Sequence, residues 1–268
     1  MIDPAVLERI AAALERLAPP PPVAADPLAH AAYAWRGDRL EAIALAALPL
    51  ERLIGIDRQR DVLLANLRRL AQGHAAHDVL LWGVRGSGKS ALAKSAVAAV
   101  QVETPALALV VAPDLKGLPG LFDQLASVQR PFAVFIDDVG VDAPADARAL
   151  RSLLEGGAEP RPAHARLIVT ANRRHLQPRD MDAQARAIHG RDAADDQLAL
   201  ADRFGLSIGF HALDQDGYLA IVQGYADAHG LAFEPADALE WAQRRGSRSG
   251  RVAWQYVVEL AGRAGRAV

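Results

Sequence analysis

The stretch Gly83–Ser90 constrains the fold of this 268-residue chain more than any other feature. It reads GVRGSGKS and matches the pattern G-x-x-x-x-G-K-[S/T], with the apolar run DVLLW before it and the helix-forming run SALAKSAVAAV after it. Glycines allow backbone angles that other residues avoid, so consecutive N–H groups can point inward at one anion. The sequence therefore predicts a strand, a phosphate-binding loop and a helix whose positive end faces the same anion.

The residue types within this loop have separate physical roles. Backbone N–H groups would cradle phosphate oxygens, Lys89 would reach the outer phosphates of ATP as a point charge, and Ser90 would offer its hydroxyl to Mg²⁺. The alternative is a chance glycine-rich turn, and the strand and the helix that flank the loop argue against it. The residues expected to contact the nucleotide are Gly83, Val84, Arg85, Gly86, Ser87, Gly88, Lys89, Ser90 and Ala91.

A pair of acids follows another apolar run, in FAVFIDDVG. Asp137 is the expected carboxylate on the magnesium side, and Asp138 is placed to orient or deprotonate a water that attacks the outer phosphate. An ordinary strand that ends in a polar turn would give the same local pattern. The phosphate loop favours the functional interpretation, because a magnesium nucleotide needs a carboxylate at the end of a neighbouring strand.

Short apolar runs alternate with amphipathic stretches through the middle of the chain, which predicts a parallel sheet between helices. Before them, a helix from Asp3 onward, the spacer PPPP and a helical stretch at 33–48 predict a helical N-terminal segment. A further helix is expected at 57–72. The runs expected to form strands are VLLW, ALALVV, FAVFI, RLIVTA and LSIGF. The expected domains are a helical segment at 1–49, an α/β core with a five-stranded parallel sheet at 50–212 and a helical lid at 213–268.

Composition argues against several classes of partner. Lys and Arg number 30 against 32 for Asp and Glu, so the total charge indicates neither a polyanion nor a membrane surface. The chain has no cysteine, which excludes disulfides and thiolate metal sites. The start, MIDPAVLERI, lacks a secretory leader pattern, and the most apolar stretch is too short to cross a bilayer. We therefore expect a cytoplasmic protein without a membrane partner.

From Leu53 to the C-terminus the chain resembles the AAA+ ATPases. LIGIDRQRD is similar to the segment that flanks adenine in that superfamily. Through the segments LIVTANRRHL, DRFGLSIGF and RSGRVAWQYV, the resemblance implies that Asn172 is a first sensor, Arg203 an arginine finger and Arg251 a second sensor. It also implies an ATP- and Mg²⁺-dependent hydrolase that forms a homo-oligomer, with Arg203 acting on the nucleotide of the neighbouring subunit.

A narrower resemblance is carried by LLWGVRGSGKS, FIDDV, LLEGG, TANRRHL, DRFGLSIGF and YLAIVQGYA. Together these segments are similar to a group of bacterial AAA+ proteins named as a domain of unknown function (815), which implies a fold and an activity class but no substrate. The chain departs from the wider superfamily at Asp138, where a glutamate is usual. Slow hydrolysis is therefore expected.

Other segments give less definite predictions. Glu155 in LLEGG is expected at a helix end rather than as a catalytic acid. The loop AEPRPAH is expected to be a surface turn, with a partner-contacting insertion as the alternative. The loop APDLKGLPG lacks the aromatic residue of protein-threading relatives, which disfavours an unfoldase. Arg173, Arg174 and His175 either touch phosphate or a neighbouring subunit, or form a solvated loop.

The favoured function is an ATP hydrolase that couples its nucleotide state to assembly or remodelling of an unknown protein partner. The alternative is a nucleotide-gated binding module similar to helicase loaders, acting on DNA-bound complexes. A P-loop kinase ranks last, because it leaves Asn172 and Arg203 unexplained. Direct DNA binding is less favoured, since the basic residues of one region lack interleaved aromatic residues. Those basic residues are Arg161, Arg166, Arg173, Arg174 and Arg179.

Overall fold

The computed structural model describes residues 3–17, 23–140, 144–154, 161–172 and 203–268. The strands within these residues are β1 (Ala32–Trp35), β2 (Leu40–Ala42), β3 (Val79–Gly83), β4 (Ala108–Ala112), β5 (Phe132–Ile136), β6 (Ala165–Asn172) and β7 (Leu206–Phe210). They form one sheet in the order β2-β1-β4-β5-β6-β3-β7. Neighbouring strands run parallel, except that β2 is antiparallel to β1.

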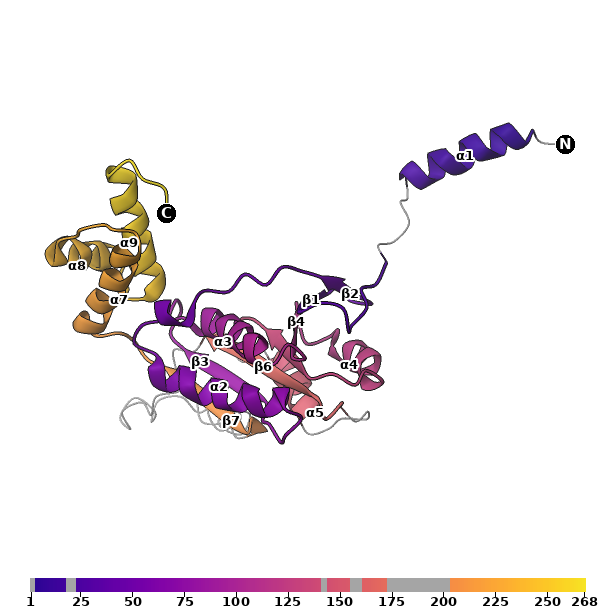
Figure 1. Ribbon diagram of the computed structural model, residues 1–268, viewed down its shortest axis with the longest axis horizontal. Helices are drawn as coiled ribbons and strands as arrows, with labels where there is room; N and C mark the ends of the chain where they lie inside the picture. Colours follow the sequence, from indigo (N-terminus) through magenta and orange to yellow (C-terminus); the bar gives the residue numbers. More distant parts are fainter. Residues whose placement is uncertain (1–2, 18–22, 141–143, 155–160, 173–202) are drawn as a thin grey trace.

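Helices pack on both faces of this sheet (Figure 1). They are α2 (Asp57–Ala71), α3 (Lys89–Glu103), α4 (Leu118–Ala126) and α5 (Pro144–Leu154). Alternate side chains of a strand belong to opposite apolar layers: Phe132 and Val134 of β5 pack with α4 and α5, whereas Phe135 packs with α2 and α3. Strands that are covered on both faces read as continuous apolar runs, which explains why they were recognisable in the sequence.

The α/β class, the strands β3 to β7 and the helix predicted at 57–72 are confirmed. The helical prediction for 33–48 is wrong, because this segment contains β1, β2 and extended chain up to the short helix η1 (Leu50–Arg52). The sheet therefore has seven strands among the described residues rather than the expected five. Local alanine content favours a helix, but Tyr33 and Trp35 are buried in the core, and this tertiary packing overrides the local preference.

The helix α1 (Pro4–Leu17) lies where the N-terminal pattern predicts it. The side chain of Asp3 accepts a hydrogen bond from the backbone N of Ala5 over 3.0 Å and caps the first turn. The apolar stripe, which includes Leu7, Ile10 and Leu14, is exposed, and α1 stands apart from the sheet in Figure 1.

The C-terminal helices α7 (Gln215–Ala228), α8 (Pro235–Arg244) and α9 (Gly250–Arg263) enclose an apolar cluster of their own. Tyr218 and Tyr256 are buried at its centre. The bundle contacts the segment before α2, since a Cβ added to Gly224 of α7 would lie 2.0 Å from Cδ1 of Ile54. None of the helices in the described part of the chain is long and apolar enough to cross a membrane.

Candidate nucleotide-binding site

The predicted phosphate loop connects the end of β3 to the start of α3. Gly83 has a φ of +136°, and a Cβ at this position would lie 1.9 Å from the backbone oxygen of Phe210 in β7. The last residues of β3 and β7 are register partners, so only glycine lets these two backbones approach as they do. Ser87 donates its hydroxyl to the backbone oxygen of Val84 over 2.8 Å and holds the loop closed.

Lys89, the first residue of α3, is enclosed by the loop and is 5% exposed. Its Nζ donates to the backbone oxygens of Gly83 and Val84 over 3.1 and 2.8 Å and to Oδ1 of Asn172 over 2.9 Å. Burial lowers the pKa of Lys89 below its usual value, while the carboxylates of Asp138 and Asp137 oppose this shift. Because water has little access to the ammonium of Lys89, the solvent would screen its charge only weakly from an anion bound in the loop.

The two acids follow β5 and face the loop. The hydroxyl of Ser90 donates to Oδ1 of Asp137 over 2.6 Å, so the two groups expected to hold Mg²⁺ are in direct contact. Both groups present oxygen atoms, which are the ligands that Mg²⁺ prefers. Asp138 has a φ of +55°. A positive φ is uncommon for residues other than glycine, although Asp and Asn adopt it more often than most other residues do.

Asn172, the last residue of β6, connects the lysine to the second acid. Its Oδ1 accepts from Lys89, and its Nδ2 donates to Oδ1 of Asp138. The amide orientation is unambiguous, because an ammonium group only donates hydrogen bonds and a carboxylate only accepts them. The sensor residue predicted by the resemblance is thus in contact with both charged groups that would act on the outer phosphate.

The C-terminal bundle covers this loop. Ser249 caps the start of α9 by accepting a hydrogen bond from Val252, and Arg251 follows it. A Cβ added to Gly86 would lie 3.0 Å from Oγ of Ser249 and 3.4 Å from Cβ of Arg251, so the lid touches the loop directly. An open cavity of about 530 Å³ lies here. It is lined by Lys89, Ser90, Asp137, Asp138, Asn172 and Arg251, together with Arg52, Thr170, Tyr225 and Trp254.

A second cavity of about 250 Å³ adjoins the first and shares Leu53, Tyr225 and Gly250 with it. Leu53, Ile54, Gly55 and Ile56 form one wall, which is the segment that the resemblance places beside adenine. Sequence reasoning missed Arg52, Thr170, Tyr225 and Trp254. A signal was present for Thr170, because it lies two residues before Asn172 and side chains at i and i+2 of a strand share a face.

Arg203 lies away from this cavity. It precedes the first residue of β7, whereas Gly83 pairs with Phe210 at the last residue of the same strand. A five-residue strand such as β7 spans about 16 Å, so Arg203 and the phosphate loop are at opposite ends of the sheet. Glu155, Arg173, Arg174, His175 and Arg179 lie outside the described residues.

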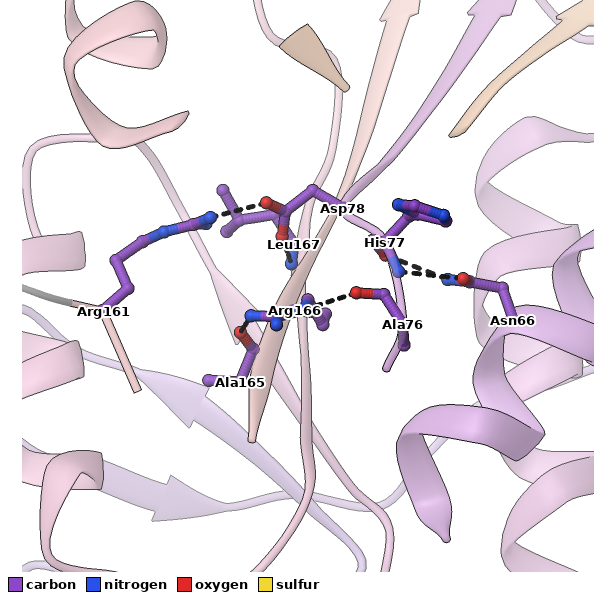
Figure 2. Close-up of polar contacts among 8 residues, drawn as sticks. All are labelled: Asn66, Ala76, His77, Asp78, Arg161, Ala165, Arg166 and Leu167. Atoms are coloured by element: carbon purple, nitrogen blue, oxygen red, sulfur yellow. Dashed lines mark hydrogen bonds and ion pairs between the residues drawn. The ribbon is translucent and has the colours of Figure 1, made fainter. Parts of the chain in front are cut away.

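Two of the arginines considered for a DNA path take part in internal contacts (Figure 2). Nη2 of Arg161 lies 2.6 Å from Oδ2 of Asp78, and the two side chains are 14% and 11% exposed. Nε of Arg166 donates to the backbone oxygen of Ala76 over 2.7 Å. These bonds attach the residues before β3 to β6 and to the segment that precedes it. Arg161 and Arg166 therefore stabilise the fold and do not form an open basic surface.

The strand order, the phosphate loop between β3 and α3, and the helical lid define the AAA+ P-loop fold. The structure is similar to the RuvB Holliday junction branch migration motor of Thermotoga maritima, with a TM-score of 0.51, 19% identity and coverage of 81% of this chain and 66% of that one. The Orc1 protein of Aeropyrum pernix, solved in complex with DNA, gives a TM-score of 0.54, 13% identity and coverage of 80% and 63%. The chain thus spans slightly less than two thirds of either protein.

The family model described as a protein of unknown function (DUF815) matches residues 28–264, and the chain therefore belongs to this family. No curated protein matches the chain. The family model covers β1 and β2 as well as the P-loop core and the lid. The predicted resemblance to AAA+ proteins and to this narrower group is confirmed.

Proposed function

We propose that this protein binds ATP between the phosphate loop and the lid and hydrolyses it, with a residue from a neighbouring subunit completing the site. The observation that carries the proposal is the connected set Lys89, Asn172 and Asp138 beside the Ser90–Asp137 pair, all facing one cavity. The ammonium would bind the outer phosphates, and Asn172 would hold Asp138 toward the attacking water.

In this scheme the water oxygen bonds to the γ-phosphorus, the bond from phosphorus to the β–γ bridging oxygen breaks, and ADP leaves. Asp138 accepts the proton of the water. Ser90 and Asp137 would hold Mg²⁺, which when bound supplies positive charge next to the phosphate oxygens. Arg251 of the lid lies at the same cavity and would contact the phosphates from the other side.

The placement of Arg203 supports a homo-oligomer. This arginine lies at the end of the sheet opposite to its own phosphate loop, so its contribution to hydrolysis would be made in a neighbouring subunit. An arginine supplied in this way raises hydrolysis by about 10³- to 10⁵-fold in other phosphoryl-transfer enzymes. Isolated subunits would then hydrolyse ATP very slowly.

A mixing experiment tests this shared site. Arg203→Ala should bind ATP like the parent and lose hydrolysis, and Lys89→Ala should lose both. Mixing the two variants should restore activity, because a Lys89→Ala subunit supplies Arg203 to the intact phosphate loop of its neighbour. Arg244→Ala is the matched control, since this exposed lid arginine pairs with Glu240 within its own helix. Mixtures as inactive as the separate variants, or full activity of Arg203→Ala, would contradict the proposal.

A nucleotide-gated binding module is the second candidate, and the short side chain of Asp138 favours it. If ATP serves as a slow switch, the lid contact between Gly86 and Ser249 is the element that nucleotide would move. Asp138→Asn separates the two functions. A hydrolase should accumulate in an assembled, ATP-loaded form when this acid is removed, whereas a switch that works without hydrolysis should assemble and release as the parent does.

We propose an unknown protein partner and action in the cytoplasm, which the absence of cysteine supports. DNA is the less favoured partner, because Arg161 and Arg166 are held by internal bonds. Electrophoretic retardation of a duplex by the intact protein, in the presence and absence of ATP, would test DNA binding directly.

A further inference from the structure

Thr170 contacts both acids of the site, and it lies in the strand next to the one that they follow. It belongs to β6, it is 1% exposed, and its strand pairs with β5 through Ile136 and Val169. Its hydroxyl is bonded on both sides: Oγ1 donates to Oδ1 of Asp137 over 2.6 Å and accepts from the backbone N of Asp138 over 2.8 Å. We propose that Thr170 is a positioning residue that sets the carboxylates of Asp137 and Asp138 for metal binding and for hydrolysis. This inference rests on the function proposed above.

The contact with Asp137 fixes the orientation of the carboxylate expected beside Mg²⁺. Oδ1 of Asp137 accepts two hydrogen bonds of 2.6 Å, one from Ser90 and one from Thr170. Hydrogen bonds to a carboxylate are among the strong ones in proteins, and they leave Oδ2 as the oxygen available to a metal ion or its water. If the hydroxyl of Ser90 turned to a bound Mg²⁺, the bond from Thr170 would still hold the carboxylate of Asp137 in place.

The contact with Asp138 fixes an uncommon backbone conformation. Asp138 has a φ of +55°, a region that residues with a side chain rarely occupy unless their surroundings impose it. Thr170 binds this turn twice, through its hydroxyl to the N–H of Asp138 and through its backbone oxygen to the N–H of Val139 over 2.9 Å. The direction in which the Asp138 carboxylate points therefore depends on β6.

Two substitutions distinguish the effect of the Thr170 hydroxyl from that of the rest of its side chain. Thr170→Val keeps the size, the β-branched shape and the backbone oxygen, and removes both bonds of the hydroxyl. Thr170→Ser keeps the hydroxyl and removes only a methyl group. Thr104→Val, at the end of α3, is the matched control, because it makes the same change at the chain's other threonine, far from the acids.

The experiment measures three quantities for the full chain: ATP affinity in EDTA, the strengthening of ATP binding by Mg²⁺, and hydrolysis as a function of Mg²⁺ concentration. Thr170→Val should bind metal-free ATP within about twofold of the parent, while its Mg²⁺ requirement rises and its kcat falls by about 10- to 100-fold, the range for groups that orient metal ligands. Thr170→Ser should recover most of both losses. Thr104→Val should match the parent.

The outcomes distinguish this inference from the proposed function. A parent that binds no ATP contradicts both. A parent that binds ATP but does not hydrolyse it contradicts the proposed hydrolase. In that case the role of Thr170 is supported if Mg²⁺ strengthens ATP binding less in Thr170→Val than in the parent, and it is contradicted if the effect of Mg²⁺ is equal. An active parent with an unchanged Mg²⁺ requirement and kcat in Thr170→Val contradicts this inference alone. So does a Thr170→Val protein whose metal-free ATP affinity falls as much as its kcat, since that indicates a structural role.

Discussion

The ammonium of Lys89 and the side-chain oxygen of Asn172 are 2.9 Å apart. This contact fixes the amide so that its NH₂ group donates to Asp138. The amide therefore joins the group that would bind the phosphates to the group that would take the proton from water.

Asn172→Leu should separate nucleotide binding from hydrolysis. A leucine has a similar size and adds no charge to the cavity, but it cannot donate a hydrogen bond to Asp138. We expect ATP affinity close to that of the parent and a fall in kcat of about 10²-fold, comparable with the loss of one stabilising donor in other enzymes. Calorimetry and a phosphate-release assay measure the two quantities. Hydrolysis at the parent's rate would contradict this role of Asn172.

Gly86→Ala should weaken ATP binding through the lid. Gly86 has a φ of +77°, and an added Cβ would lie 3.0 Å from Oγ of Ser249. Gly73→Ala is the matched control, because Gly73 has a φ of +72° and its added Cβ would meet nothing within 4 Å. Both variants should lose about 1–2 kcal/mol of unfolding free energy from the left-handed backbone. Only Gly86→Ala should also lose ATP affinity, and a Gly86→Ala protein with the parent's ATP affinity would contradict this role of the lid contact.

ATP binding in alkaline solution should take up protons. Burial lowers the pKa of Lys89, so the free protein loses this proton at a lower pH than an ordinary lysine does. Bound phosphates would raise the pKa again, so the fraction of Lys89 that is deprotonated in the free protein is protonated on binding. Heats of binding should then depend on the ionisation enthalpy of an alkaline buffer. Lys89→Arg should abolish this dependence, because arginine stays charged, and heats independent of buffer in the parent would disprove the expectation.

Arg161→Gln should reduce the stability of the fold without changing the affinity for ATP. Arg161 and Asp78 are largely buried partners (Figure 2). Asp78 directly precedes β3, whereas the phosphate loop follows the other end of this strand. Losing the charged partner of Asp78 should cost about 2 kcal/mol of unfolding free energy. Arg244→Gln breaks an exposed pair with Glu240 and should change stability by less than about 1 kcal/mol. Urea unfolding measures the stability of both variants. A clear loss of ATP affinity in Arg161→Gln would contradict the expectation that this ion pair acts independently of the nucleotide site.

Much of this site could be predicted because its signals are local. The phosphate loop depends on glycines and a lysine at fixed spacing, and Asp137 and Asp138 follow a buried run that reads as a strand. The placement of Asn172 beside them came from a resemblance to a family rather than from periodicity. Its hydrogen bonds to Lys89 and Asp138 are visible only in the folded chain.

The rest depends on contacts between segments distant in sequence. Thr170 acts through the pairing of β5 with β6, which no local pattern specifies. The hairpin of β1 and β2 lies in the stretch 33–48 that was predicted as helix. Gly37, with a φ of +91°, and Asp38 mark its turn, and this glycine-containing turn between apolar runs was the signal for a hairpin.

Calorimetric titration of the intact protein with MgATP tests the central claim most directly. The parent should bind ATP, and Lys89→Ala should bind it at least about tenfold more weakly, equivalent to about 1.4 kcal/mol. Lys94→Ala, which removes another lysine of the same helix, should bind like the parent. A parent that shows no binding, or a Lys89→Ala protein with the parent's affinity, would contradict the account.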